Sequence, residues 1–441
     1  MSATEMPTGG LQTYKRTRQS AILLACAGLI VIAGACTEII MWAGIVVRDA
    51  DASTWGSDIY TLLGMMFIAM VLSVAGIARL PQEETGGDPV RGGTRKSWLI
   101  LAMLILIHCY LALSYNKQVR GDTIDTYTFQ RDACRSLLQG IDPYGTTQAN
   151  ISDPFHIKLF YGPGMVVNGR VQVGFQYPPL TLLWALPGYL LGDVRFSYVL
   201  AVVVSALLLF AICPNTRGLW IVSVLLLSLL TLLVESRCWT EPLVLMALSA
   251  TMYAAVKKRW WLPVALGLFL ATKQYNFLAL PLIGYFVHPF NWRAYWKLTG
   301  LSLAIGAATV LPFAFWNFRS LWHDLVLFHL AQPFRQDAVS FAVLLPLMLK
   351  IGPLLLVAFI VWALRVRRRY AAMFAAAYGV ALLLFVLTSK QAFANYFFLI
   401  GQAFFLTVAA LPGVPMKSKV RRNAEIEGAG ANTVATLPAR T

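Results

Sequence analysis

The sequence is poor in charge, above all in acidic residues. Of its 441 residues only 13% are charged, and 20 Asp and Glu stand against 36 Lys and Arg. Roughly 25% of the residues in a soluble globular domain are charged, so this composition argues against that class. The hydrophobic share of 58% and the mean hydropathy of +0.65 indicate a polytopic α-helical membrane protein instead.

Several catalytic and binding signatures are also missing. The sequence has no Gly-rich phosphate loop, no Ser-His-Asp arrangement and no Cys/His spacing typical of zinc. We therefore assign no metal ligand and expect no cofactor, and a cytosolic nucleotide-using enzyme has no support. The net charge of +16 does not indicate nucleic acid, because the basic residues cluster in short loops and at the termini, as membrane orientation signals do.

What the sequence has in abundance is apolar runs, which recur from residue 21 to residue 411. Several are shorter than the ~20 residues that cross a bilayer upright. Short runs broken by Pro or polar residues indicate half-helices, or helices that end at a cavity. We therefore predict an all-α polytopic membrane protein with about 11–13 transmembrane or re-entrant helices.

Basic clusters predict which ends of these helices face the cytoplasm. The polar loop 116–179 carries six basic and five acidic residues and can lie outside. Counting helices back from the C-terminus gives one conflict, because 180–213 holds two apolar runs where one crossing is needed. Either 180–191 is a re-entrant or interfacial helix, or one boundary is wrong. The basic clusters lie at 15–18, 257–259, 365–369 and 417–422, and the outer segments at 235–241, 272–276, 317–340 and 390–391.

Composition also divides the chain. We expect a cytoplasmic segment at 1–20, two transmembrane helices with a linker at 21–97, and the main membrane domain at 98–411. Residues 412–441, rich in Gly, Ala, Thr and charge, predict a disordered cytoplasmic tail.

The long loop holds the first candidate catalytic residues. Residues 123–139 are predicted to form a helix that stops at Gly140. Asp122 and Asp125 are three residues apart and share one face of such a helix. Capping or the helix dipole explains each of them without catalysis. A carboxylate just outside the bilayer, beside an apolar wall, can keep a raised pKa and act as a base. Asp125 is the preferred candidate.

Four cations on the predicted outer side form the second set. Each interrupts or borders an apolar run, so each needs a counter-charge. A phosphate is one such partner. The alternatives are pairing with Glu235, Glu241 or Asp337, or snorkelling to lipid headgroups. The four residues are Arg237, Lys273, Arg335 and Lys390.

Several short motifs share an order along the chain that resembles a known family. An acidic residue opens the first large outer loop, and the other motifs are Leu137-Leu138-Gln139-Gly140-Ile141-Asp142-Pro143-Tyr144, Tyr177-Pro178-Pro179-Leu180, Trp239-Thr240-Glu241-Pro242, Thr272-Lys273-Gln274, Gln332-Pro333-Phe334-Arg335 and Lys390-Gln391-Ala392-Phe393 with Asn395-Tyr396. This order resembles the C-type integral-membrane glycosyltransferases. The closest group is the bacterial family-87 set, related to polyprenyl-phosphate-mannose-dependent mannosyltransferases. The resemblance covers most of residues 98–400.

The resemblance implies a fold of many helices, a catalytic Asp in an outer loop, and inversion at the anomeric carbon. The sugar, mannose or another hexose or pentose, would pass from a polyprenyl-phosphate donor to an envelope glycolipid or glycan acceptor. The protein would lie among the lipids of the bacterial inner (plasma) membrane with an extracytoplasmic active site. One departure is that two helices in 21–80 precede the helix leading into the loop, where the family commonly has one.

Carried onto this sequence, the resemblance assigns the base to Asp125, with Asp122 as the fallback. The four cations become candidates for the donor phosphate. Aromatic residues of the loop could stack on sugar faces, although anchoring at the membrane interface explains them equally well. The further substrate-binding candidates are Tyr144, Tyr177, Trp239, Glu241, Gln274 and Asn395.

Two other functions compete with this one. Broken helices and intramembrane cations would also suit a transporter or flippase of lipid-linked saccharides, although no two related halves are visible in the sequence. The third reading is a non-catalytic assembly factor for cell-envelope polymers.

Overall fold

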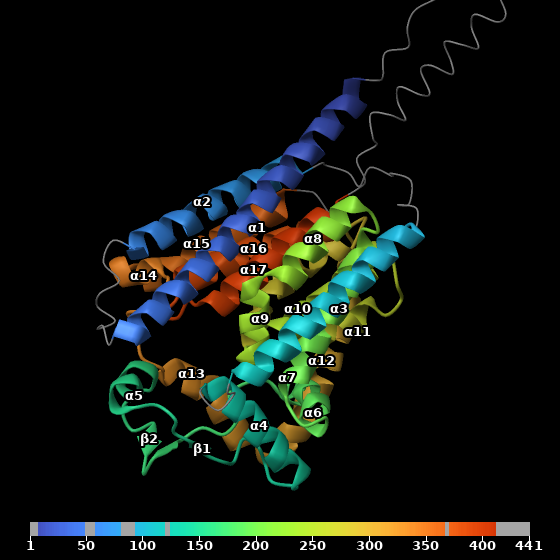
Figure 1. Ribbon diagram of the computed structural model, residues 1–441. Coiled ribbons are helices and arrows are strands. Elements are labelled where there is room, and N and C mark those ends of the chain that lie inside the picture. The colour runs from blue at the N-terminus through green and yellow to red at the C-terminus, as the bar shows by residue number, and fades with distance from the viewer. Residues whose placement is uncertain (1–7, 49–57, 81–92, 120–123, 367–369, 412–441) are drawn as a thin grey trace, which may run out of the picture.

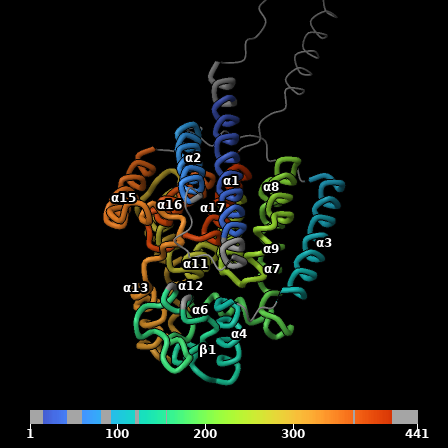
Figure 2. The backbone as a smooth tube through the Cα atoms, turned by 60° about the vertical axis from the view of Figure 1, so that its left-hand side comes forward, coloured from blue at the N-terminus to red at the C-terminus, as the bar shows by residue number. Residues whose placement is uncertain are grey.

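A computed structural model describes residues 8–48, 58–80, 93–119, 124–366 and 370–411. Long helices form a bundle, and a smaller layer of short helices and strands covers one end of it (Figure 1). The tube view shows the same layering, with α4 and β1 below the long helices (Figure 2). We call this layer, residues 124–178, the cap. The fold is that of an all-α polytopic membrane protein, as predicted, with the polar loop folded into the cap.

Length and composition identify the membrane-spanning helices. Six described helices are long and apolar enough to cross a bilayer, and the pair α8–α9, bent by 50°, makes a seventh. Four shorter apolar helices accompany them: α10, α11, α16 and α17. The helical bounds are α1 Thr8–Arg48, α2 Asp58–Arg79, α3 Arg95–Gln118, α7 Arg195–Ile212, α8 Thr216–Leu227, α9 Leu229–Ser236, α10 Glu241–Val256, α11 Leu262–Thr272, α12 Trp292–Trp322, α15 Met348–Arg365, α16 Ala371–Leu387 and α17 Ala394–Ala410.

The two N-terminal helices are part of the main body. α1 packs against α2 and α17, and α2 also contacts α16. Their buried side chains, such as Leu24, Val31 and Met66, belong to the same hydrophobic core as those of α16 and α17. The N-terminal pair is therefore packed against the bundle, with the N-terminal end of α1 extending beyond it (Figure 1).

The cap is built from α4 (Asp125–Leu138), α5 (Pro154–Phe160) and a small antiparallel sheet in the order β1-β3-β2. Its strands are β1 (Gln148–Ala149), β2 (Val166–Val167) and β3 (Arg170–Val171), and Val171 is opposite both Gln148 and Val166. The helix expected over 123–139 is present with slightly different ends. It stops where predicted, because Gly140 adopts the left-handed φ of +72°. Asp122 lies outside the described residues.

Helix α6 (Pro179–Leu190) settles the conflict over 180–213. Its twelve residues span only about 18 Å. Gly192, with φ +105°, turns the chain directly into α7. The first residue of α7, Arg195, donates from Nη1 to the carbonyl oxygen of Val119 at the end of α3 (2.9 Å). Helix α6 therefore starts and ends on the cap side of the bundle, which agrees with the re-entrant or interfacial alternative.

The outer segment predicted over 317–340 begins within the last turns of α12. In the structure the backbone leaves helical geometry at Asn317, and the chain then continues through a π-helix, η4 (His323–Leu327), into α13 (Phe328–Ala331). Phe318 and Trp322 are exposed, whereas Leu321 and Phe328 are buried. The amphipathic pattern is present, and the break separates it from the membrane-spanning part of α12. The short helix α14 (Phe341–Leu344) follows.

Loops that are far apart in the sequence meet beneath the cap. A 3₁₀ segment, η3 (Gln274–Phe286), starts there after α11. Gln274 donates from Nε2 to the carbonyl of Gln176 in the cap (3.0 Å), and the N–H of Arg335 donates to the carbonyl of Lys390 (3.2 Å). The outer segments predicted from the charge pattern are thus brought together on one side of the bundle.

Candidate functional site

Asp125 is the first residue of α4 and lies at the junction of cap and bundle. Its Oδ1 accepts a hydrogen bond from the N–H of Thr126 (2.7 Å), and its Oδ2 lies 3.5 Å from the Tyr161 hydroxyl. Burial raises the pKa of this carboxyl, and the positive charge of Arg335 acts in the opposite direction. The helix cap is Ile124, which makes no side-chain capping bond. Asp125 is therefore not the N-cap, and its Oδ2 faces the site.

Lys273 lies between α11 and η3, under Tyr177. Its Nζ is 3.4 Å from Glu241 Oε1, also bonds Thr240 Oγ1, and lies 4.4 Å from the centre of the Tyr177 ring. Glu241 Oε1 accepts from the Tyr275 hydroxyl as well (3.2 Å). Desolvation lowers the pKa of Lys273 despite the nearby carboxylate. The pairing alternative raised for this cation is thus realised, and the Tyr177 ring covers one side of the ammonium group.

Arg335 is also held by a carboxylate. Its guanidinium makes a two-pronged contact with Asp337, from Nε to Oδ1 at 2.6 Å and from Nη2 to Oδ2 at 2.5 Å. The rings of Phe160 and Phe393 lie 4.3 Å and 4.7 Å from its Cζ. This contact leaves Nη1 without a partner among the described residues. The guanidinium is fixed in a rigid orientation while keeping donors for another anion.

Lys390 belongs to a turn at the same end of the bundle. Its Nζ donates to the carbonyl oxygens of Leu330 (2.8 Å) and Gln332 (2.6 Å). An ammonium group has three N–H donors, so one remains for a further acceptor. No carboxylate pairs with Lys390 within the described ranges, and desolvation lowers its pKa. It is the cation of this group that most needs an external counter-charge.

Arg237 differs from the other three cations. Its Cζ lies over the Trp239 ring at 5.7 Å, and the Tyr115 hydroxyl of α3 lies within electrostatic range. The Thr126 hydroxyl donates to its backbone carbonyl (2.5 Å). The backbone at 237 therefore supports the start of α4, and its side chain has Trp239 and Tyr115 as neighbours.

The remaining predicted substrate-binding residues have different surroundings. Tyr144 is 2% exposed, packs edge-on against Phe175 and Phe313, and donates its hydroxyl to the Tyr177 carbonyl (2.8 Å). Its ring is packed largely into the core, and Tyr144 also borders a polar cavity. Gln274 bonds the cap backbone, and Asn395 is buried in the first turn of α17.

The charges of the site act on one another across several elements. Burial raises the pKa of the Tyr177 hydroxyl, and the charges of Asp125 and Glu241 both raise it further. Lys273 and Lys390 both lie within electrostatic range of His329, whose Nε2 is 2.9 Å from the Gln176 carbonyl oxygen. Asp125, Lys273, Arg335 and Lys390 therefore surround one region between the cap and the bundle, and Arg237 does not join them.

The structure adds two residues that no motif in the sequence marked. His329 bonds the cap backbone beside Gln274. Glu38 of α1 is 3% exposed, accepts a hydrogen bond from the N–H of Ala394 and lies within electrostatic range of Asp337 and Arg335. Its Oε2 has no partner among the described residues. Both contacts are long-range in the sequence, so no local pattern could have marked them.

Comparisons with known proteins are sparse. No protein-family model and no curated protein matches the sequence. Two solved structures are similar in their overall arrangement. Both are ArnT from Cupriavidus metallidurans. The structure bound to undecaprenyl phosphate has a TM-score of 0.45 and 17% sequence identity, with 79% of this chain and 67% of that chain covered. The apo structure has a TM-score of 0.44 and 18% identity, with 76% of this chain and 66% of that chain covered.

Proposed function

We propose that the protein is an inverting membrane glycosyltransferase. In this proposal it moves a hexose or pentose, with mannose as the first candidate, from a polyprenyl-phosphate donor to an envelope glycolipid or glycan. The reaction takes place on the outer face of the bacterial plasma membrane, where the cap lies. The carrying observation is that a partly buried carboxylate, Asp125, lies within the field of Arg335 and within electrostatic range of Tyr177, which contacts Lys273.

The chemistry follows from the charges of these groups. Asp125 takes the proton of the acceptor hydroxyl while that oxygen attacks the anomeric carbon of the donor sugar. The bond between that carbon and the phosphate oxygen breaks, and its electron pair leaves with the lipid phosphate. A single displacement inverts the anomeric centre. The raised pKa of Asp125 suits a base of this kind, since proton transfer becomes more favourable as the base strengthens.

The cations stabilise the leaving group. Arg335 keeps Nη1 free and Lys390 keeps one N–H, so both offer donors to a phosphate. Lys273, which lies under the Tyr177 ring, supplies positive charge. Its contact with Glu241 offsets part of that charge. Positive charge fixed in advance where negative charge develops lowers the barrier, because the donors need not reorient during the reaction.

The decisive experiment is Asp125→Asn in membranes or in detergent, with transfer of a labelled sugar from its polyprenyl phosphate as the readout. Loss of the base should lower the rate about 10²–10⁴-fold. Asp132→Asn is the matched control, because Asp132 lies on the same helix but pairs with Arg131 (2.9 Å). It should transfer normally.

Stability separates a lost base from a lost fold. The folded-state pKa of Asp125 is raised, so the stabilisation linked to its protonation is present below the ordinary Asp pKa of about 4 and is lost as the pH rises through the raised value. At pH 7 the ionised carboxylate costs folding free energy, and Asn removes that cost. We therefore expect the variant to melt no lower than wild type. Normal transfer by this well-folded variant would contradict the proposal.

A further inference from the structure

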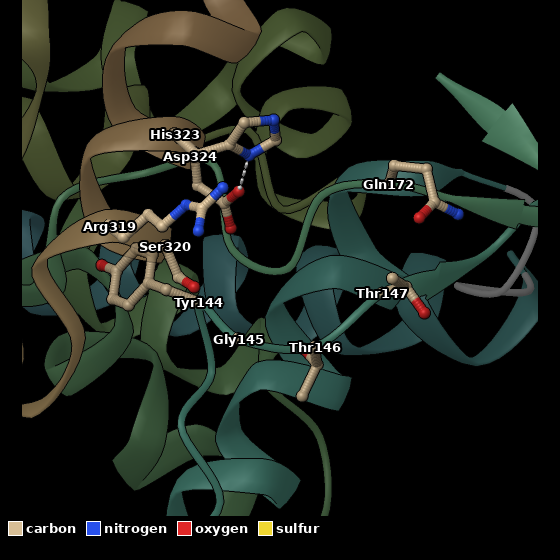
Figure 3. Close-up of a pocket in the computed structure, with 9 residues that line it drawn as sticks. All are labelled: Tyr144, Gly145, Thr146, Thr147, Gln172, Arg319, Ser320, His323 and Asp324. Atoms are coloured by element: carbon tan, nitrogen blue, oxygen red, sulfur yellow. Dashed lines mark hydrogen bonds and ion pairs between the residues drawn. The ribbon is translucent and has the colours of Figure 1, made fainter. Parts of the chain in front are cut away.

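A polar cavity of about 220 Å³ lies between the cap and the end of α12. None of Asp125, Lys273, Arg335 and Lys390 lines it. Figure 3 shows Arg319, Ser320 and His323 of the α12–η4 segment on one wall, with Thr147 and Gln172 of the cap on the other. The complete lining is Tyr144, Gly145, Thr146, Thr147, Gln172, Arg319, Ser320, His323 and Asp324.

The helical break creates this wall. Helical geometry fails at Asn317 and a π-helix begins at His323, and between them Arg319 and Ser320 line the cavity. Asp324 is 1% exposed and attaches η4 to the cap, because its Oδ2 accepts hydrogen bonds from the N–H groups of Gly174 (2.8 Å) and Phe175 (3.0 Å). π-Helical turns occur frequently at functional sites, and here one holds a bundle helix against the cap.

Two nitrogen-bearing side chains of the wall are available to a ligand. His323 Nδ1 is 2.8 Å from Asp324 Oδ1, which orients the ring and leaves Nε2 unbonded. Arg319 is exposed, and within the described part of the chain its guanidinium has no hydrogen-bonded or ion-paired partner. The unpaired guanidinium can bind an anion, and the imidazole, whose Nδ1–H is held by a buried carboxylate, adds a second donor at Nε2 when it is protonated.

The rest of the lining suits a sugar. Ser320, Thr146, Thr147 and Gln172 place hydroxyl and amide groups around the same hollow. Its volume of about 220 Å³ is below the ~300–1,000 Å³ of most small-molecule sites, and therefore fits one sugar unit rather than an oligosaccharide. Phe315, Phe318 and Trp322, 84%, 64% and 48% exposed, lie on the same segment and mark the membrane interface beside it.

One extended segment connects the cavity to the proposed catalytic region. Gln172 lines the cavity, Gly174 and Phe175 bond Asp324, and Tyr177 lies over Lys273. Five residue steps of extended chain cover at most about 18 Å. Gln172 is therefore no more than about 18 Å from Tyr177, and Tyr177 lies within electrostatic range of Asp125. A substrate in the cavity is thus only a few sugar rings away from Asp125.

We propose that this cavity binds a phosphorylated or carboxylated sugar of the acceptor, with Arg319 and His323 on the anion and the hydroxyl and amide groups on the ring. This inference rests on the proposed transferase function. It adds that the acceptor is an anionic saccharide at the membrane surface and that the cap recognises it apart from the donor.

The test uses the purified full-length chain with glucose 6-phosphate as probe, and glucose and inorganic phosphate as its two halves, with binding followed by saturation-transfer and ³¹P NMR. Glucose 6-phosphate should bind more tightly than either half. Arg319→Gln should weaken it about tenfold or more, since a charge-assisted hydrogen bond is lost. Arg293→Gln is the matched control, because Arg293 is an exposed arginine at the other end of α12, and it should bind as wild type does.

A second variant and a second readout keep the outcome clear. Ser320→Trp fills the hollow and should block binding even if Arg319→Gln disturbs the local fold. Asp125→Asn should bind the probe normally. With the natural acceptor, Arg319→Gln should raise the acceptor KM and leave the donor KM unchanged. Equal binding of inorganic phosphate and glucose 6-phosphate, or full binding and transfer by both cavity variants, would overturn the inference while Asp125→Asn still tests the transferase function separately.

Discussion

The two ends of the bundle treat their charged side chains in opposite ways. At the end away from the cap, Lys258, Arg293 and Arg365 are exposed to the surroundings. At the cap end, Glu241 and Asp337 are 0% and 1% exposed, and Lys273 is 7% exposed. Burying charge is costly unless each group is paired. Among the described residues this cost is concentrated at the cap end, which is where the proposed chemistry takes place.

A second contrast lies within the cap end itself. Around Asp125 the cations Lys273 and Arg335 are held by carboxylates, whereas Arg319 in the cavity has no such partner within the described ranges. Paired cations are positioned before any substrate arrives. An unpaired, exposed cation can exchange water for a ligand at lower cost. The first arrangement suits stabilisation of a developing charge, and the second suits reversible recognition.

The largest effect is expected from Lys273→Met, which would remove the cation and leave Glu241 buried and unpaired. Breaking a buried pair in this way costs about 3–5 kcal/mol. We expect a strong loss of sugar transfer and a large fall in melting temperature, measured in detergent. Adding Glu241→Gln should restore most of the stability and none of the transfer. Restored transfer in the double variant would show that the pair is only structural.

The next effect should come from Gly174→Ala in the segment that joins the cavity to Tyr177. A Cβ at this position would lie 2.3 Å from the Pro143 carbonyl oxygen, so the segment must shift. Overpacking costs about 1–3 kcal/mol, and the hydrogen bonds to Asp324 would weaken with it. Both probe binding and transfer should fall. Gly300→Ala is the control, since a Cβ there meets nothing within 4 Å, and it should behave as wild type.

A smaller effect concerns pH. Arg335 favours the ionised form of Asp125, so Arg335→Gln with Asp337→Asn should raise the pKa of Asp125 further. A base works only when ionised, and the rate falls as the pH drops through its pKa. The acidic limb of the rate profile should therefore move to higher pH than in wild type. A limb that stays in place would mean that another group is the base.

The smallest effect is expected at the opposite end of the bundle. Lys258→Ser removes an exposed charge that has no role in the proposed reaction. Stability should change by no more than about 0.5 kcal/mol, and transfer by membranes containing equal amounts of protein should be unchanged. A large loss of transfer would erase the contrast between the two ends.

Local pattern was enough to predict much of this molecule. Apolar runs marked the helices, Gly140 marked the end of α4, and charge placed 235–241, 272–276 and 390–391 together. The sequence also offered Glu241 and Asp337 as partners for the cations, and the structure pairs them with Lys273 and Arg335. Each of these inferences depended on short-range spacing or on the sign of a charge.

What could not be predicted depends on which elements pack together. Tyr144 was a candidate for sugar stacking or interface anchoring, and the structure packs its ring edge-on against Phe175 and Phe313. The cavity at Arg319 exists because α12 breaks at Asn317 and its end meets the cap. Neither the break nor the partner surface has a signature in the local sequence.

Glu38 has a practical consequence for any shortened form of the chain. Its carboxylate lies at the start of α17 and within reach of the field around Arg335, although it comes from the N-terminal helix pair. A version beginning at residue 93 would keep every proposed catalytic group and still lose this carboxyl group, together with the apolar surface that α1 covers. Complementation with residues 1–80 supplied as a separate polypeptide would then be the natural way to restore it.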